Sequence, residues 1–96
     1  MAGMLSIGFE FNGEFYYMFA KIKDQEAIRE YQITLMNSKL SKILSDSIIL
    51  KELNGYLTVS TFKETMDQKG LKICIAKELS AFLHVPFINI NVPTFD

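Results

Sequence analysis

The dipeptide Asn12-Gly13, which lies between two strand-like runs, constrains the fold of this chain more than any other feature. Both central residues of a type I′ turn need positive φ angles, which Asn and Gly tolerate best. The sequence therefore predicts a hairpin in which residues 5–11 pair with residues 14–23. Because a two-residue loop fixes the register of the strands, we expect Gly8 to lie opposite Tyr17, an arrangement in which a cross-strand aromatic ring covers a glycine.

This register makes the second strand of the hairpin apolar on both faces. One face of the hairpin has the composition of a core and carries Leu5, Ile7, Phe9, Phe11, Tyr16, Met18, Ala20 and Ile22. The opposite face of the second strand carries Phe15, Tyr17 and Phe19, followed by Lys21 and Lys23. A strand with two apolar faces needs cover on both of them. We expect that cover to come from a partner, from the short helix or from the 87–95 tail.

The rest of the chain predicts a middle strand, a second hairpin, two helices and a terminal strand. In chain order these elements are expected at 29–36 (strand), 37–46 (short helix), 48–53 and 56–62 (hairpin around Asn54-Gly55), 71–84 (main helix) and 88–92 (strand). Thr65 and Gln68 have the spacing of a capping box, although Gly70 fits a later start of the main helix. The terminal strand can pair in its own sheet or with a neighbouring chain.

These elements predict an α+β fold, in which a curled antiparallel sheet of about five strands packs on the C-terminal helix. The short helix lies between strands 3 and 4. The length of 96 residues, at 11.0 kDa, corresponds to a single domain over 1–96. With 49% hydrophobic and 22% charged residues the chain is not a disordered tail, and one cysteine excludes an intrachain disulfide.

Composition and the first residues also bear on location and partners. The formal net charge of −1 does not point to nucleic acid or to an anionic membrane. The N-terminal residues lack a basic region followed by a long apolar run, and no stretch reaches the roughly 20 apolar residues of a membrane helix. We therefore expect a cytoplasmic protein that does not bind membranes.

Two residue types that often carry chemistry, histidine and cysteine, occur once each. His84 is expected at the end of the main helix, where a partial positive charge suits the helix dipole. Cys74 falls on the apolar stripe of the same helix, which is typical of a core cysteine. Glu10 and Glu14 are interpreted as solvated charges beside the turn. We therefore predict no catalytic, cofactor-binding or metal-binding residues and no cofactor, and we expect that the protein is not an enzyme.

The face formed by Phe15, Tyr17, Phe19 and Lys21 is the candidate interaction face. Contiguous apolar surface is typical of protein interfaces, and homodimers are the commonest oligomers. The leading hypothesis is therefore a non-catalytic module that binds itself or another protein. The alternative is a small-ligand-binding protein, or an enzyme with weak sequence signals, whose ligand lies between sheet and helix. A third hypothesis is stacking of single-stranded nucleic acid on the aromatics, which the surrounding acidic residues disfavour.

Three segments also carry a resemblance to other proteins. They are Phe9-Glu10-Phe11-Asn12-Gly13, Glu30-Tyr31-Gln32-Ile33-Thr34 and Leu53-Asn54-Gly55-Tyr56-Leu57, which precede a terminal helix. In this arrangement the chain resembles short uncharacterised α+β proteins found in Bacteroides-type genomes. The resemblance implies a bacterial protein and an α+β fold. It implies no activity, and no site residues are transferred from it.

Overall fold

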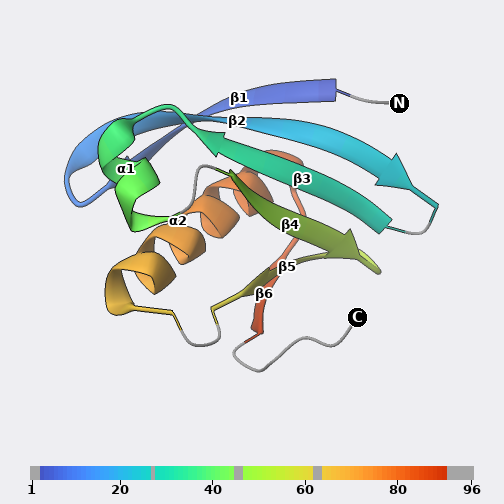
Figure 1. The fold of residues 1–96 in the computed structure, drawn as a ribbon. Coiled ribbons are helices and arrows are strands. Elements are labelled where there is room, and N and C mark those ends of the chain that lie inside the picture. Colours follow the sequence, from blue (N-terminus) through green and yellow to red (C-terminus); the bar gives the residue numbers. More distant parts are fainter. Residues whose placement is uncertain (1–2, 27, 45–46, 62–63, 91–96) are drawn as a thin grey trace.

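The computed structural model describes residues 3–26, 28–44, 47–61 and 64–90, and within these ranges six strands form one sheet in the order β1-β2-β3-β4-β5-β6 (Figure 1). The elements are β1 (Gly3–Phe11), β2 (Glu14–Gln25), β3 (Ile28–Leu35), α1 (Ser38–Ile43), β4 (Ser47–Leu53), β5 (Tyr56–Ser60), α2 (Met66–Leu83) and β6 (Phe87–Ile90). Neighbouring strands are antiparallel from β1 to β5, and β6 is parallel to β5. The predicted α+β fold, with a short helix between the third and fourth strands, is confirmed.

Both Asn-Gly turns have the backbone that the sequence predicts. Asn12 and Gly13 have φ angles of 52° and 80°, and the turn at 54–55 has 52° and 82°. The strands that flank the first turn pair in the predicted register, with Gly8 opposite Tyr17. These local turns therefore position the whole of β1 and β2, and β3 continues the meander from β2.

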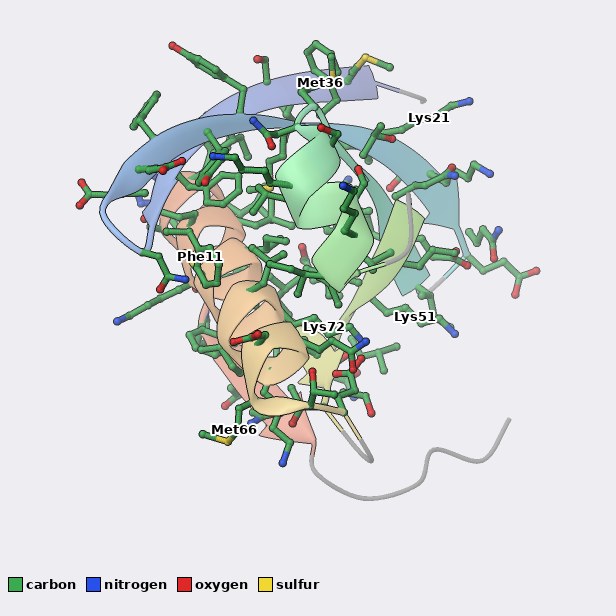
Figure 2. The ribbon with its side chains drawn as sticks, turned by 60° about the vertical axis from the view of Figure 1, so that its left-hand side comes forward. Phe11, Lys21, Met36, Lys51, Met66 and Lys72 are labelled. Atoms are coloured by element: carbon green, nitrogen blue, oxygen red, sulfur yellow. The ribbon has the colours of Figure 1, made fainter. Side chains whose placement is uncertain are left out.

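The core lies between one face of the sheet and the two helices. Phe9, Met18 and Ile33 on the sheet and Leu71, Ile75 and Leu79 on α2 are all buried to within 1% of complete burial. In Figure 2, Phe11 lies next to α2, whereas Lys21 and Lys51 extend away from both helices. The predicted alternation of core and solvent positions along the strands is therefore confirmed.

Residues 45–46 of the predicted short helix and residue 62 of the predicted second hairpin lie outside the described residues. The largest difference from the predicted element bounds is at the start of α2. The helix begins at Met66 instead of residue 71, because the capping box of Thr65 and Gln68 is formed. The Thr65 hydroxyl accepts a hydrogen bond from the Gln68 backbone, and the Gln68 side chain accepts one from the Thr65 backbone. Gly70 therefore lies inside the helix and does not mark its start.

The C-terminal strand pairs within its own sheet. Leu57 of β5 lies opposite Phe87 of β6, and the Leu57 amide donates a hydrogen bond to the Pro86 carbonyl over 2.8 Å. Of the predicted strand 88–92, residues 91 and 92 lie outside the described part of the chain. The described part of the tail lies at the edge of the sheet opposite to β1, away from the aromatic residues of β2.

Candidate interaction surface

The outer face of the sheet, defined here as the face turned away from α1 and α2, is not covered by any described element (Figure 1). Phe15 and Tyr17 of β2 keep 62% and 57% of their surface exposed on it. Met36, just after β3, is 56% exposed and stays in register, since its amide donates to the Tyr17 carbonyl over 3.4 Å. The described residues of the short helix and of the tail therefore leave the aromatic face, meaning the part of the outer face around Phe15, Tyr17 and Phe19, open to solvent.

The predicted interaction residues Phe15, Tyr17, Phe19 and Lys21 do lie together on this face, at alternate positions of β2. Phe19 is half-buried and Lys21 is exposed. Sequence reasoning missed Met4 on β1 and Met36 just after β3, which extend the same face and are 64% and 56% exposed. The signal was present, because the period-2 alternation of β1 and β3 continues to these two positions.

A close contact between Phe15 and Gly8 shapes the centre of this face. A Cβ atom built on Gly8 would lie only 2.4 Å from Cζ of Phe15, so the ring occupies the space that a side chain would need. The sequence prediction assigned this cover to Tyr17 and is wrong on this point. Phe15 reaches Gly8 diagonally, and Tyr17 packs edge-on against the Phe15 ring with centroids 5.2 Å apart and an interplanar angle of 86°.

A row of alternating charges crosses the outer face next to the aromatic residues. Lys23 of β2 lies opposite Glu30 of β3, which in turn lies opposite Lys51 of β4. Opposite charges on facing strands attract, and each such pair contributes roughly 0.2–1 kcal/mol. The mixed row separates the aromatic end of the face from a second apolar area at Leu53 and Tyr56.

Cys74 and His84, the residue types that most often carry chemistry, lie within α2 and at its C-terminal end. The Cys74 thiol donates a hydrogen bond to the Glu10 carbonyl over 3.1 Å. Burial raises the pKa of this thiol, and nearby Glu78 adds to the effect, so the nucleophilic thiolate is disfavoured. His84 is exposed and ends α2 in the left-handed conformation, with a φ of 59°.

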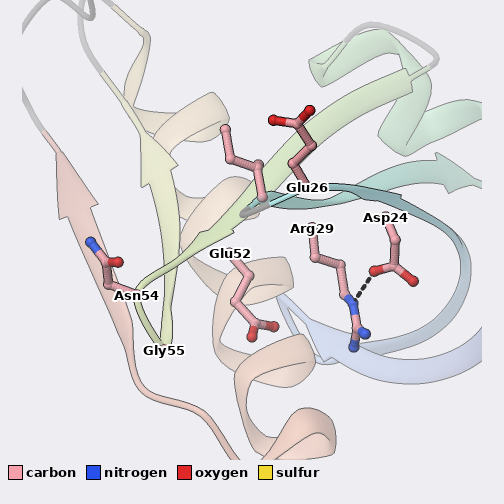
Figure 3. A pocket seen from close by; sticks show the side chains of 7 residues that line it. Asp24, Glu26, Arg29, Glu52, Asn54 and Gly55 are labelled. Atoms are coloured by element: carbon pink, nitrogen blue, oxygen red, sulfur yellow. Dashed lines mark hydrogen bonds and ion pairs between the residues drawn. The ribbon is translucent and has the colours of Figure 1, made fainter.

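An open pocket of about 400 Å³ lies at the opposite end of the sheet from the first turn. Its lining consists of Asp24, Glu26, Ile28, Arg29, Glu52, Asn54 and Gly55. Figure 3 shows Arg29 and Glu52 on the same side of the sheet, with the Arg29 guanidinium bonded to Asp24 over 2.5 Å. This hydrogen bond holds the pKa of Asp24 below its ordinary value. The space between sheet and α2, where the sequence prediction placed a ligand, is filled by buried core side chains.

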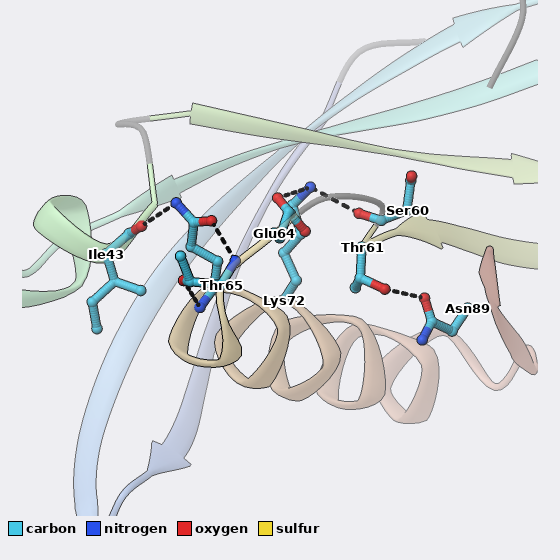
Figure 4. Close-up of polar contacts among 8 residues, drawn as sticks. Ile43, Ser60, Thr61, Glu64, Thr65, Lys72 and Asn89 are labelled. Carbon is cyan, nitrogen blue, oxygen red and sulfur yellow. Dashed lines mark hydrogen bonds and ion pairs between the residues drawn. The ribbon is translucent and has the colours of Figure 1, made fainter. Parts of the chain in front are cut away.

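A polar cluster beside the start of α2 connects that helix to its neighbours (Figure 4). The Lys72 ammonium contacts Glu64 at 2.9 Å and donates to the Ser60 carbonyl at 2.9 Å. The Gln68 amide donates to the Ile43 carbonyl at the end of α1. The Lys72–Ser60 bond links α2 to β5, and the Gln68–Ile43 bond links α2 to α1.

Comparisons with protein-family models, with curated proteins and with solved structures found no match to this chain. Among the described residues, no group of three or more His, Cys, Asp and Glu side chains is arranged to hold a metal ion. The helices in the described ranges are too short or too polar to cross a membrane. The exposed aromatic face and the open pocket are thus the two features that a functional proposal can use.

Proposed function

We propose that this protein is a non-catalytic interaction module that self-associates, and that the aromatic face around Phe15, Tyr17, Phe19 and Lys21 is its contact surface. The observation that carries the proposal is the exposure of Phe15 and Tyr17 on an open sheet face, near the first turn. Two large rings left in water forgo the burial that normally stabilises aromatic residues. A second copy of the chain that contacts these rings removes part of this surface from water.

The size of the aromatic face supports association with a protein surface. A large side chain buries roughly 150–250 Å² when fully covered, so the exposed parts of Phe15, Tyr17, Met4 and Met36 together offer roughly 400–500 Å². Patches of this size on small proteins are often functional. A standard interface buries about 800 Å² per partner, so the aromatic face supplies about half of one.

Charge favours a protein partner over single-stranded nucleic acid on this face. A nucleic-acid platform combines stacked aromatics with a basic groove that follows the phosphates. Here Glu10 lies opposite Phe15, and Glu30 lies between Lys23 and Lys51. Acidic side chains at these places repel phosphates, whereas a copy of the same mixed surface can pair its charges.

The direct test is the mass in solution, measured by light scattering behind a sizing column over a range of concentrations. The wild type is expected to shift from monomer to dimer as its concentration rises. Tyr17→Thr, which keeps a good strand residue at the position, is expected to raise the midpoint of that shift about tenfold. Tyr56→Thr is the matched control, because Tyr56 is 45% exposed on the same face but lies across the charged row. Equal midpoints for the two variants would show that the aromatic face is not the contact surface.

A second candidate function is the binding of a small cationic molecule in the pocket beside Arg29. Three acidic side chains and one basic side chain line this pocket, so its net charge is negative. Amines and guanidinium compounds are therefore the class to screen by thermal shift. A ligand at a hundredfold excess over its dissociation constant stabilises the fold by roughly 2.7 kcal/mol. A response that persists in Glu52→Gln at unchanged concentration would place the ligand elsewhere.

A further inference from the structure

Strand β1 forms an edge of the sheet and pairs only with β2 among the described strands. The residues that flank a two-residue turn form a hydrogen-bonded pair, here Phe11 with Glu14. Because pairing alternates along antiparallel strands, the odd-numbered residues of β1 direct their backbone groups to β2. The even-numbered residues, Met4, Ser6, Gly8 and Glu10, therefore direct theirs outward, away from the sheet.

This edge lacks the features that normally prevent strands from pairing. Over the nine residues of β1 the sequence contains no proline and no lysine, and Glu10 is its single charge. The Glu10 carbonyl is already bonded to the Cys74 thiol of α2. The groups available for another strand are thus those of Met4, Ser6 and Gly8. At the opposite edge, the described part of β6 has four residues.

We infer that β1 pairs with β1 of a second copy in antiparallel alignment, with the two Ser6 residues facing each other on the two-fold axis. The inference rests on the proposed self-association and specifies how the second copy is bound. In this register Met4 of each copy lies opposite Gly8 of the other, and these residues exchange the hydrogen bonds that their outward groups can make. The two sheets then become one continuous sheet, with both aromatic faces on the same side. The Met4 side chain of each copy lies over Gly8 of the other, beside the Phe15 ring, and this is where the aromatic face enters the interface.

The side chains of the two strands are complementary in this register. Met4 is 64% exposed, and the residue opposite it, Gly8, has no side chain. The Phe15 ring covers Gly8, so the Met4 thioether of the second copy packs against the edge of that ring, a favourable sulfur–aromatic contact. On the other face, half-buried Leu5 lies opposite Ile7 of the second copy and gains apolar cover.

The charges of the two copies also match. The outer face of the hairpin is acidic at Glu10 and basic at Lys21 and Lys23. Antiparallel pairing brings Glu10 of one copy to the same face as Lys23 of the other, about 10 Å away between backbones, which is within reach of the two side chains. The two Glu10 residues stay about 27 Å apart, well beyond the screening length in physiological salt.

A register shifted by two residues, with Ile7 on the axis, is less favourable. It places Met4 opposite Glu10, whose carbonyl already accepts the Cys74 thiol. It also moves Met4 away from Gly8, so the exposed thioether meets the Glu10 side chain and not the Phe15 ring. The register centred on Ser6 uses the available backbone groups and leaves the Cys74 contact intact.

The test combines a crosslink with an edge substitution. In a Cys74→Ser background, whose hydroxyl keeps a donor for the Glu10 carbonyl, Ser6→Cys places two thiols in a facing pair with Cα atoms about 5.5 Å apart, a spacing that a disulfide accepts. Mild oxidation is therefore expected to give a covalent dimer. The control, Met4→Cys in the same background, leaves its thiols about 14 Å apart along the strands and is expected to stay monomeric on a non-reducing gel. Equal crosslinking of both variants would overturn the register.

The edge substitution is Ser6→Pro, which removes an outward amide and leaves the bonds to β2 in place, as proline on an edge strand allows. Its dimerisation midpoint is expected to rise at least about tenfold, whereas Ser6→Ala keeps the amide and the wild-type midpoint. If Ser6→Pro stays dimeric while Tyr17→Thr dissociates, the copies stack through their aromatic faces and the edge pairing is wrong. If the wild type is monomeric at every concentration, the proposed self-association fails as well. If Ser6→Pro does not fold, the comparison of crosslinking between Ser6→Cys and Met4→Cys still tests the edge pairing.

Discussion

On the outer face, the Phe15 ring occupies the space that a side chain at position 8 would need. In the wild type, Gly8→Ala pushes its new methyl group into the Phe15 ring, which must then leave its place over the backbone. We expect this variant to be neutral or destabilised. In a Phe15→Ala background the same substitution meets no ring and should stabilise the fold by about 0.5–1 kcal/mol, the usual gain of alanine over glycine in a strand.

A double-mutant cycle in urea measures this opposition as a coupling free energy. Sites in contact commonly couple by roughly 0.5–3 kcal/mol, and separate sites are additive. Additive effects of Gly8→Ala and Phe15→Ala would show that the ring does not rest on Gly8 in solution. The sequence could indicate that an aromatic side chain covers Gly8 but not which one, because the choice depends on side-chain rotamers that the register leaves open.

The hydroxyl of Tyr31 links stability to alkaline pH. Tyr31 is buried and donates to Glu52 over 2.8 Å. Burial, and then this hydrogen bond, raise the pKa of Tyr31 to about 12 from 10.0. Because the folded pKa lies above the unfolded one, the stabilisation is complete below about pH 10 and is lost as the pH rises through about 12.

Tyr31→Phe tests this linkage, since phenylalanine keeps the ring and removes the titrating group. We expect the variant to be less stable than the wild type at neutral pH and the difference to shrink between about pH 10 and 12. Ultraviolet titration of the phenolates checks the assignment independently. If the variant still shows the highest-pH phenolate transition, the raised pKa belongs to another of the four tyrosines.

At the scale of the element, α2 contains a glycine that its fold does not need. Gly70 lies inside the helix, and a Cβ built on it would make an ordinary contact of 3.8 Å with Phe11 Cε1. Gly70→Ala should therefore raise the free energy of unfolding by about 0.5–1 kcal/mol. Gly13→Ala is the contrasting variant, because φ at Gly13 is +80° and the same change there should destabilise by about 1–2 kcal/mol.

The elements show how far local sequence determines the fold. The register of the first hairpin was predictable to the residue because Asn12-Gly13 closes it locally, although both strands extend two residues beyond the predicted bounds. The start of α2 was less certain, because the capping box at Thr65 and the glycine at position 70 gave competing signals. The cap outweighs the glycine, since a formed cap contributes about 1 kcal/mol and the following helix buries its apolar side on the sheet.

The placement of β6 could not be derived from its own residues. Alternation at 88–92 indicates a strand but carries no information about its neighbour. Parallel pairing with β5 needs a crossover connection, which α2 provides only once it has packed on the sheet. The same limit applies to the candidate interaction face. The sequence predicted Phe15, Tyr17 and Phe19 on one side of β2, but where residues 87–90 of the tail lie relative to them depended on this long-range pairing.

At the scale of the whole molecule, the sheet has a helical layer on one side and no described element on the other (Figure 1), where Phe15 and Tyr17 are exposed. If self-association binds the folded chain and not the unfolded one, mass action makes the melting temperature depend on protein concentration. Wild-type protein should therefore melt at a higher temperature as its concentration rises. Tyr17→Thr should show a weaker dependence, while Tyr56→Thr should follow the wild type.

Added salt distinguishes the apolar from the ionic contribution to this concentration dependence. Added sulfate increases, or leaves unchanged, the stabilisation that comes from apolar burial around Phe15. Exposed ion pairs, such as those expected between Glu10 of one copy and Lys23 of the other, are screened by salt. Sodium chloride at about 0.5 M should therefore lower the concentration dependence slightly and sulfate should not. A melting temperature that stays constant over a hundredfold range of concentration would show that the open face is stable in water as a monomer, and its aromatics would then need a different partner.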